Sequence, residues 1–402
     1  MPTPTAPVPT LAIVALSIAA FGVAASARVT DPLLPVLARD FGVGIGTAVS
    51  VVTVFTVAYG LFQLGYGPIA DRFGKYRVIA WACAASAVTA LACALAPTIW
   101  LLVFARFLAG GTAGAVIPLS MAWIGDAVPY NQRQPVLARF LTGQMFGFSA
   151  GSLMGGLGAE HFGYPAPFLF LACWLGGASA ILFYLLRRAK ALDTLGTNEA
   201  SRRDFLAGIA YVWRQRWARV ILATVFFEGT FMFGAFAFIA THLNRHYGIS
   251  LSFAGTIVML YGVGGLVFAA LAPVLVRRLG EVGLARSGGV LICAALLAIA
   301  VFTTWPIAAL ATMVMGMGFY MLHNTLQTNA TQMAPERRGT AVAQFAASLF
   351  LGQSAGVALA GIVAERADTD SVLIAGAFGV LAIALVFAHL RRARRATVAG
   401  LP

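Results

Sequence analysis

The chain has 402 residues, of which 60% are hydrophobic and only 10% are charged, and its formal net charge at pH 7 is +13. Soluble domains carry about 25% charged residues, so this chain lacks the polar side chains that would cover a soluble core of its size. We therefore expect an integral membrane protein with many spanning helices.

Apolar runs long enough to cross about 30 Å of hydrocarbon recur along the whole chain. They occupy residues 11–30, 45–67, 77–97, 98–124, 137–159, 164–186, 218–242, 252–275, 284–304, 307–332, 340–363 and 371–390. None of them alternates as the strands of a membrane β-barrel do, so the sequence predicts an all-α protein with twelve transmembrane helices. The N-terminal MPTPTAPVPT has no Lys or Arg, and we therefore interpret the first run as a retained span rather than a signal peptide.

The basic residues predict the orientation of the chain in the membrane. If both termini are cytoplasmic, the cytoplasmic connections and the C-terminal tail hold all but five of the 27 Lys and Arg residues. The exceptions are Arg28, Arg39, Arg106, Arg245 and Arg366. This asymmetry favours a multi-pass protein of the bacterial inner (cytoplasmic) membrane with both termini inside. It also explains the net charge by anionic lipid, without nucleic acid as a partner.

The longest connection divides the chain into two groups of six runs. We predict a cytoplasmic tail at 1–10, an N-terminal half at 11–186, a cytoplasmic linker at 187–217, a C-terminal half at 218–390 and a basic cytoplasmic tail at 391–402. RRDFLAGIAYVWRQRWARV, at 202–220, mixes Arg with aromatic residues and predicts an amphipathic helix at the membrane surface.

The two groups of runs also repeat in sequence. AGSLMGGLGAE at 150–160 matches AGVALAGIVAE at 355–365 in five of eleven positions. Repeats of six spans in the same orientation are typical of transporters whose site lies between the halves.

The connection after the second run, GYGPIADRFGKYR, combines glycines with closely spaced charges. Its notable residues are Gly67, Asp71, Arg72, Gly74, Lys75 and Arg77. The glycines allow tight turns, and the Asp71 carboxylate could pair with Arg72 or accept from the N-terminus of a neighbouring helix. Such a cluster can hold one packing of the half and release it in another, and we interpret it as a gating loop. A solvated basic loop is the alternative.

The spacing of this loop resembles the signature of the major facilitator superfamily. Two further matches are Arg106-x-x-x-Gly110-x-x-x-Gly114 and Gly147-x-x-x-Gly151-Ser152-x-x-Gly155-Gly156. The second is similar to the antiporter motif of drug:proton exchangers, although Ser152 stands where that motif usually has proline. Asp31-x-x-x-Pro35 resembles a motif of the twelve-span multidrug branch. The resemblance implies the major facilitator fold, with two pseudo-symmetric halves of six helices, and makes Arg106 a proton-relay or cavity residue.

Small residues recur every fourth position in the fifth run. They are Gly143, Gly147, Gly151 and Gly155, followed by Gly156. A face of small residues lets helices approach closely, and we predict that this face is a hinge that slides during transport. A static packing face is the alternative.

One carboxylate, Glu228, interrupts the apolar run at 218–242. It lies about ten residues into the run and therefore roughly 15 Å deep. An ionised carboxylate there is costly, so burial favours its protonated form. We predict that Glu228 takes up a proton from one side of the membrane and releases it to the other, with Arg106 as its exchange partner. A protonated Glu that only hydrogen-bonds a neighbouring helix is the alternative.

Other polar residues of the apolar runs are candidates for proton coupling or for a substrate cavity. Asp31 and Arg28 are i,i+3 neighbours that can pair, either for coupling or as an interfacial ion pair. Tyr59 with Gln63, and His323 with Gln327, are i,i+4 pairs, and Asn324 follows His323. These polar groups could line a pore or join helices to one another. Arg106 could also serve packing alone, by donating to backbone carbonyls.

The sequence contains only weak indications of a metal site or of reactive cysteines. His242 and His246 have a spacing that can bind zinc, but no third ligand is evident in the sequence, so we predict no metal site. The four cysteines, Cys83, Cys93, Cys173 and Cys293, lie in apolar runs without CxxC spacing, and we predict that all four are buried.

These observations together predict a secondary active transporter. The resemblance implies proton-coupled efflux of a small organic solute by a monomer in lipid, with the proton gradient as energy source and no cofactor. Proton-linked uptake of an organic acid or siderophore-like solute is the second hypothesis, since Arg28 and Arg106 would attract an anion. A membrane sensor that does not transport is the third. No HExxH motif, no GxSxG with partner residues and no nucleotide-binding loop is present, so we expect no enzyme.

Overall fold

The computed structural model describes residues 10–188 and 202–398, and all regular structure in these ranges is helical. The tail at 1–9, the first part of the linker at 189–201 and the last residues at 399–402 lie outside the described residues. Ten described helical segments are long and apolar enough to cross a membrane. The all-α membrane fold predicted from the sequence is confirmed.

Two adjustments make the ten segments consistent with twelve crossings. The helix α15, Leu251–Val301, is too long for one span, and its backbone leaves helical geometry at Gly280, where φ is +60°. Only a residue without Cβ adopts this conformation readily, and the chain turns there, so α15 holds two predicted spans. The second adjustment adds a crossing that is not among the ten segments. The helix α8, Tyr130–Leu157, is as long as its neighbours and packs along α1, so we count it as a span.

The N-terminal half contains the first six crossings. Its helices are α1 (Thr10–Arg28), α4 (Ser50–Phe73), α5 (Lys75–Ala94), α6 (Ile99–Ala113), α7 (Val116–Ala127), α8, and α9 (Pro165–Arg188). Two short helices, α2 (Leu34–Asp40) and α3 (Ile45–Ala48), fill the connection between α1 and α4. A π-helical turn, η1 (Gly158–Phe162), follows α8. One hydrophobic cluster is built almost entirely from this half.

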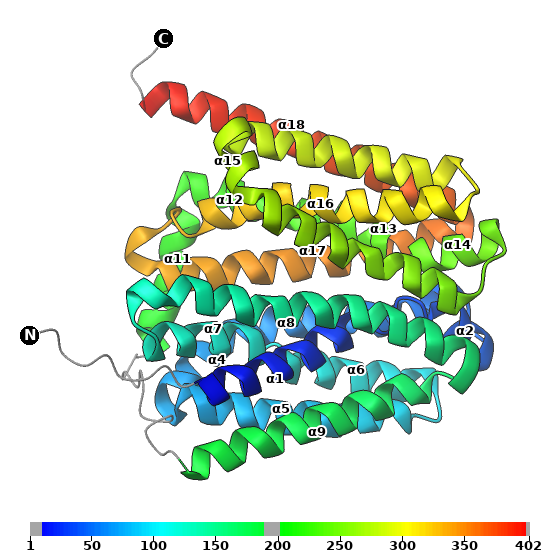
Figure 1. Ribbon diagram of the computed structural model, residues 1–402, viewed down its shortest axis with the longest axis horizontal. Coiled ribbons are helices and arrows are strands. Elements are labelled where there is room, and N and C mark those ends of the chain that lie inside the picture. The colour runs from blue at the N-terminus through cyan, green and yellow to red at the C-terminus, as the bar shows by residue number, and fades with distance from the viewer. Residues whose placement is uncertain (1–9, 189–201, 399–402) are drawn as a thin grey trace, which may run out of the picture.

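The C-terminal half contains the remaining crossings. Its elements are α11 (Arg202–Arg214), α12 (Arg216–Glu228), η2 (Gly229–Phe233), α13 (Gly234–Phe236), α14 (Ile239–Tyr247), α15, α16 (Trp305–Ala330), η3 (Pro335–Arg337), α17 (Arg338–Arg366) and α18 (Thr369–Val398). A second hydrophobic cluster belongs to this half, and a third joins helices of both halves. In Figure 1 the helices of the two halves form one bundle, with both termini at the same end. We call the opposite end, where α2 and α14 lie, the far end.

Two local predictions were wrong. The stretch 202–220 is two helices, because Gln215 has an extended backbone (ψ 118°) and ends α11 before α12 begins. The helix α18 continues to Val398, so part of the predicted basic tail is also helical. Cys173 is exposed on α9, whereas the other three cysteines are buried as predicted.

The glycines of the repeat pack in the same way in both halves. A Cβ at Gly147 or Gly151 of α8 would collide with the backbone of α1, at Phe21 and Ala25. In the C-terminal half, Gly352 and Gly356 of α17 approach the backbone of α12 and η2 at Phe226 and Thr230. Within each half, this row therefore sets the distance between the first and fifth spans.

Candidate functional site

Glu228 lies at a break in the seventh span. It is the last residue of α12 and directly precedes the π-helical turn η2, after which the span continues as the short helices α13 and α14. Its side chain is completely buried. A π-helical turn inside an α-helix is rare and is often found at functional sites. The backbone geometry beside Glu228 therefore supports a functional role for this residue.

The partner of Glu228 is His323 of α16. The Nδ1 atom of His323 lies 2.9 Å from Oε2 of Glu228, while Oε1 has no hydrogen-bond partner among the described residues. Glu228 and Arg106 are not paired in this structure, because α16 rather than α6 faces this carboxylate. The His323 imidazole gives the buried carboxylate a hydrogen bond, and when protonated also an opposite charge.

Aromatic rings connect this pair with the N-terminal half. The imidazole of His323 stacks on Phe319 at 4.9 Å between ring centres, and Phe319 contacts Phe233 at 5.3 Å. The guanidinium of Arg28, from α1, lies 4.3 Å from the centre of the Phe233 ring. A cation over an aromatic face is attracted by the quadrupole of the ring, so this chain of contacts crosses between the two halves.

Arg28 also forms the ion pair predicted from its spacing. Its guanidinium lies 3.5 Å from the carboxylate of Asp31, and both side chains are buried. An interfacial pair would be exposed, so that alternative is wrong. Two tyrosines extend the aromatic surface, since Tyr261 contacts Phe236 at 4.9 Å and Tyr320 at 6.1 Å between ring centres.

Arg106 has its partners inside the N-terminal half. It is completely buried on α6 and donates to the carbonyl oxygens of Val51 and Ser26, at 3.3 and 3.1 Å. Its guanidinium also lies 4.0 Å from the centre of the Phe55 ring. These contacts join α1, α4 and α6, which is the packing role that the sequence left open beside the relay role.

The remaining cavity candidates do not come together as one surface. Tyr59 and Gln63 are buried on α4, where Tyr59 stacks on Phe350 of the other half at 4.1 Å. On α16, Asn324 is half-buried and Gln327 is exposed, whereas His323 points to Glu228. His323 and Gln327 therefore do not share one environment as predicted, because His323 contacts a buried carboxylate and Gln327 is exposed.

The predicted gating loop holds its charges within its own half. The Asp71 carboxylate lies 3.8 Å from Nζ of Lys75, and Lys75 also pairs with Asp126 at 2.7 Å. The predicted Asp71–Arg72 pair is replaced by this contact, and the Arg72 guanidinium lies 5.2 Å from the Phe73 ring centre. Gly74 has φ +90° and joins α4 to α5, which places Lys75 beside Asp71. Gly67 has open space around it, and Arg77 follows in α5.

All five predicted hinge glycines lie on α8, and four of them pack against their own half. Gly143, Gly147, Gly151 and Gly155 all face α1, at Ser17, Phe21, Ala25 and Val29. Gly156 instead approaches Leu251 of α15, in the other half. The long row thus packs one half, and Gly156 lies at the contact between halves.

Two glutamates join the halves at the far end. Glu160 of η1 accepts the backbone N–H of Ser252, at the start of α15, at 3.0 Å. Glu365 of α17 accepts the backbone N–H of Gly46 in α3 at 2.7 Å. These residues end the two repeat segments recognised in the sequence, and each carboxylate binds the N-terminus of a helix in the other half, where the helix dipole favours negative charge.

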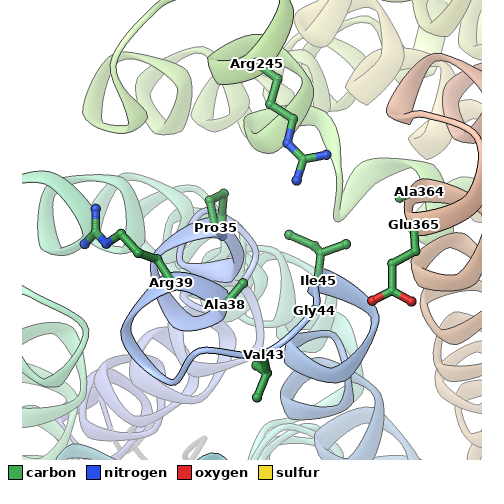
Figure 2. Close-up of a pocket in the computed structure, with 9 residues that line it drawn as sticks. All are labelled: Pro35, Ala38, Arg39, Val43, Gly44, Ile45, Arg245, Ala364 and Glu365. Carbon is green, nitrogen blue, oxygen red and sulfur yellow. The ribbon is translucent and has the colours of Figure 1, made fainter.

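Figure 2 shows the surroundings of Glu365. Its carboxylate points toward the loop at Gly44 and Ile45, and the guanidinium of Arg245 of α14 points toward the same loop from above. The residues enclose a depression of about 450 Å³. Sequence reasoning missed both glutamates as functional residues, although the repeat already ended at them.

Known proteins with similar sequences are membrane transporters. The pattern of the Major Facilitator Superfamily matches residues 16–356. An MFS-type transporter of Bacillus subtilis, YceJ, which is described as uncharacterized, is 25% identical over 83% of this chain and 84% of its own. The multi-drug resistance efflux pump PmrA of Streptococcus pneumoniae is 32% identical over 38% of this chain and 39% of its own.

The fold also matches solved structures. The crystal structure of the POT family transporter PepTSo superposes with a TM-score of 0.77, covering 96% of this chain and 98% of the other. The two sequences are 15% identical, so this likeness shows the arrangement of helices and not the substrate.

Proposed function

Because the chain belongs to the major facilitator superfamily, we propose that it exports a small organic solute in exchange for protons. Membership makes the protein a membrane transporter and not an enzyme. Export, proton coupling and the kind of solute are the parts that we propose. The partial similarity to an efflux pump supports export.

The buried Glu228–His323 pair carries the proposal of proton coupling. A carboxylate without water needs a proton or a positive partner, and here the partner is an imidazole, which can bind a proton and then carries a positive charge. The pair can take up a proton when water reaches it from one side and lose it to the other side. The Asp31–Arg28 pair is the second proposed coupling group, because the aromatic rings that lie between Arg28 and His323 connect the two halves.

The contacts between halves support alternating access. At the far end the halves touch at Glu160, Gly156, Glu365 and Gly46. These contacts support a state in which the transporter is closed at the far end. Exchange requires these far-end contacts to open while the other end closes, and we propose that the Asp71 loop regulates that second step.

We also propose an orientation of the protein in the membrane and the partners with which it acts. With the basic residues facing the cytoplasm, the far end faces the outside of a bacterial inner membrane. The partners are the solute and membrane lipids, the protein acts as a monomer without nucleic acid, and the proton gradient takes the place of a cofactor. The aromatic rings around Arg28 and His323 suit a solute with an apolar ring system.

Purified protein in liposomes tests this function. A counterflow screen with aromatic cations and aromatic carboxylic acids identifies a solute, and an internal pH dye then measures proton movement when that solute is added outside or inside. We expect solute and proton to move in opposite directions. Movement in the same direction would establish proton-linked uptake instead, the hypothesis favoured by an anion at Arg28. No movement of any compound, with proton-tight liposomes, would favour a sensor.

A further inference from the structure

Four metal-ligating side chains gather at the far end, apart from the Glu228 site. His242 and His246 lie one turn apart on α14, Asp370 lies in the first turn of α18, and Asp368 precedes that helix. Ligand atoms of His242, His246 and Asp370 all lie within 4.8 Å of one another. The absence of a third ligand inferred from the sequence was wrong, because the aspartates follow the histidines by more than 120 residues.

The hydrogen bonds of His242 leave the right nitrogen for a ligand. Its Nε2 lies 3.2 Å from the carbonyl oxygen of Ile299, and a carbonyl only accepts, so Nε2 carries the hydrogen. In the neutral ring the lone pair is then on Nδ1, which faces the aspartates. An outer hydrogen bond to a backbone carbonyl is the usual way in which proteins orient a histidine that binds metal.

The groups around Nδ1 can rearrange without losing their partners. The Thr369 hydroxyl now lies 3.0 Å from Nδ1, but it is also 3.3 Å from Asp368 Oδ1 and can donate there instead. Asp370 Oδ1 lies 3.4 Å from Nδ1, is buried and has no hydrogen-bond partner among the described residues. A buried carboxylate oxygen without a donor is costly, and a cation between it and the imidazole would satisfy both.

His246 and Asp368 complete the set. The Nε2 atom of His246 lies 3.3 Å from both carboxylate oxygens of Asp368. The backbone N–H of Thr369 donates to Oδ1 of Asp368 at 2.6 Å and fixes the position of this carboxylate beside His246. Arg245, between the histidines in sequence, points into the depression of Figure 2 and brings its charge toward the other half.

We propose that His242, His246 and Asp370 bind a divalent transition-metal ion of the zinc class, with Asp368 as fourth ligand. Zinc bonds of about 2.0–2.2 Å place tetrahedral ligands roughly 3.3 Å apart, so ligand atoms that now lie within 4.8 Å of one another must move closer together. The side chains of His246 and Asp370 are partly exposed and can make that movement. Imidazole with carboxylate selects zinc over magnesium, which prefers oxygen ligands alone. The bound ion would link α14 to α18 within the C-terminal half.

The test uses the full chain in detergent, with any polyhistidine tag removed. Equilibrium dialysis against ZnCl₂ gives the stoichiometry and affinity, and thermal unfolding with and without Zn²⁺ gives a second readout that does not depend on transport. We expect one Zn²⁺ per chain and a higher unfolding temperature, with no such effect of MgCl₂. His246→Asn and Asp370→Asn should each weaken Zn²⁺ binding at least tenfold.

His161→Asn is the matched control, because His161 is an exposed histidine of the far end outside the cluster. It should bind Zn²⁺ as the unchanged protein does. The buried His242 is left intact in these variants, so loss of binding cannot be blamed on an unfolded core, and their unfolding temperatures without metal check this. Failure of the unchanged protein to bind Zn²⁺, equal binding by both cluster variants, or equally tight Mg²⁺ binding would each overturn the proposal.

Discussion

Glu228 and His323 share one short contact, 2.9 Å between a carboxylate oxygen and an imidazole nitrogen, although 95 residues separate them in the chain. Each of the two side chains can carry a proton, and their contact joins α12 to α16. A movement that separates these helices removes the imidazole that compensates the buried carboxylate.

Replacement of Glu228 by Gln should abolish transport driven by a proton gradient. The amide keeps the size of the side chain and can still hydrogen-bond His323, so folding should persist, but it cannot exchange a proton. Flux driven by a pH gradient in liposomes should fall to background, while solute counterflow without a gradient continues. Glu336→Gln, at an exposed glutamate in η3, is the control. Gradient-driven flux of normal size in the Glu228 variant would remove this residue from the mechanism.

Replacement of His323 by Gln should destabilise the protein unless Glu228 is changed as well. Removing one member of a buried charged pair leaves the other uncompensated, at a cost of about 3–5 kcal/mol. Thermal unfolding of both single variants and the double variant measures the coupling. We expect Glu228→Gln to restore most of the stability lost in His323→Gln. Strictly additive losses would show that the two side chains do not stabilise each other.

Two glycines of α8 should respond differently to Ala. A methyl group at Gly151 meets α1 in the same half. It should therefore lower the free energy of unfolding by about 1–3 kcal/mol, and with it the unfolding temperature. At Gly156 it meets Leu251 of the other half, so it should separate the halves at the far end.

Spin labels on α2 and α15 measure this difference. Arg39→Cys and Phe253→Cys, in a Cys173→Ser background, place one label on each half, and their separation should increase only with Gly156→Ala. Gly177→Ala is the control, since that position has open space. An unchanged separation in Gly156→Ala would show that the far end does not close at this glycine.

The far-end carboxylates should make closure depend on charge and on pH. A hydrogen bond to a charged acceptor is about twice as strong as a neutral one, so Glu160→Gln and Glu365→Gln should each widen the label separation, and the double variant more. The backbone N–H of Ser252 lowers the pKa of Glu160. Its contribution to closure is therefore complete at neutral pH and is lost as the pH falls below the usual range of a glutamate.

Label distances recorded across a pH series test this sign. The separation should grow toward acid in the unchanged protein and less so in Glu160→Gln. A separation that shrinks toward acid would contradict the role of Glu160.

Patterns within a single helix were predictable from the sequence. Hydrophobic runs predicted the spans, an i,i+3 spacing predicted the Arg28–Asp31 pair, and a four-residue spacing predicted a close-packed face on α8. These features depend only on the pitch of one helix. Even so, the partner of that face, α1 of the same half, was not evident, and neither was the break at Gln215.

Contacts between distant segments were beyond sequence reasoning. The partner of Glu228 depends on how α12 and α16 rotate about their axes, which the spacing of residues in either helix leaves free. The same holds for Arg106, whose partners are backbone carbonyls with no residue signature. Nothing in the sequence around Asp368 and Asp370 indicates that they lie beside the histidines. Their proximity depends on how α18 packs against α14.

The position of Cys173 gives the chain a built-in reporter of its surroundings. This thiol is exposed at the middle of α9, an apolar helix, while the other three cysteines are buried. In a bilayer it faces hydrocarbon, where a charged, water-soluble maleimide cannot reach it and the thiol cannot form its reactive thiolate. The extent of labelling by that reagent therefore measures, without any substitution, how completely lipid covers the outer side of the N-terminal half.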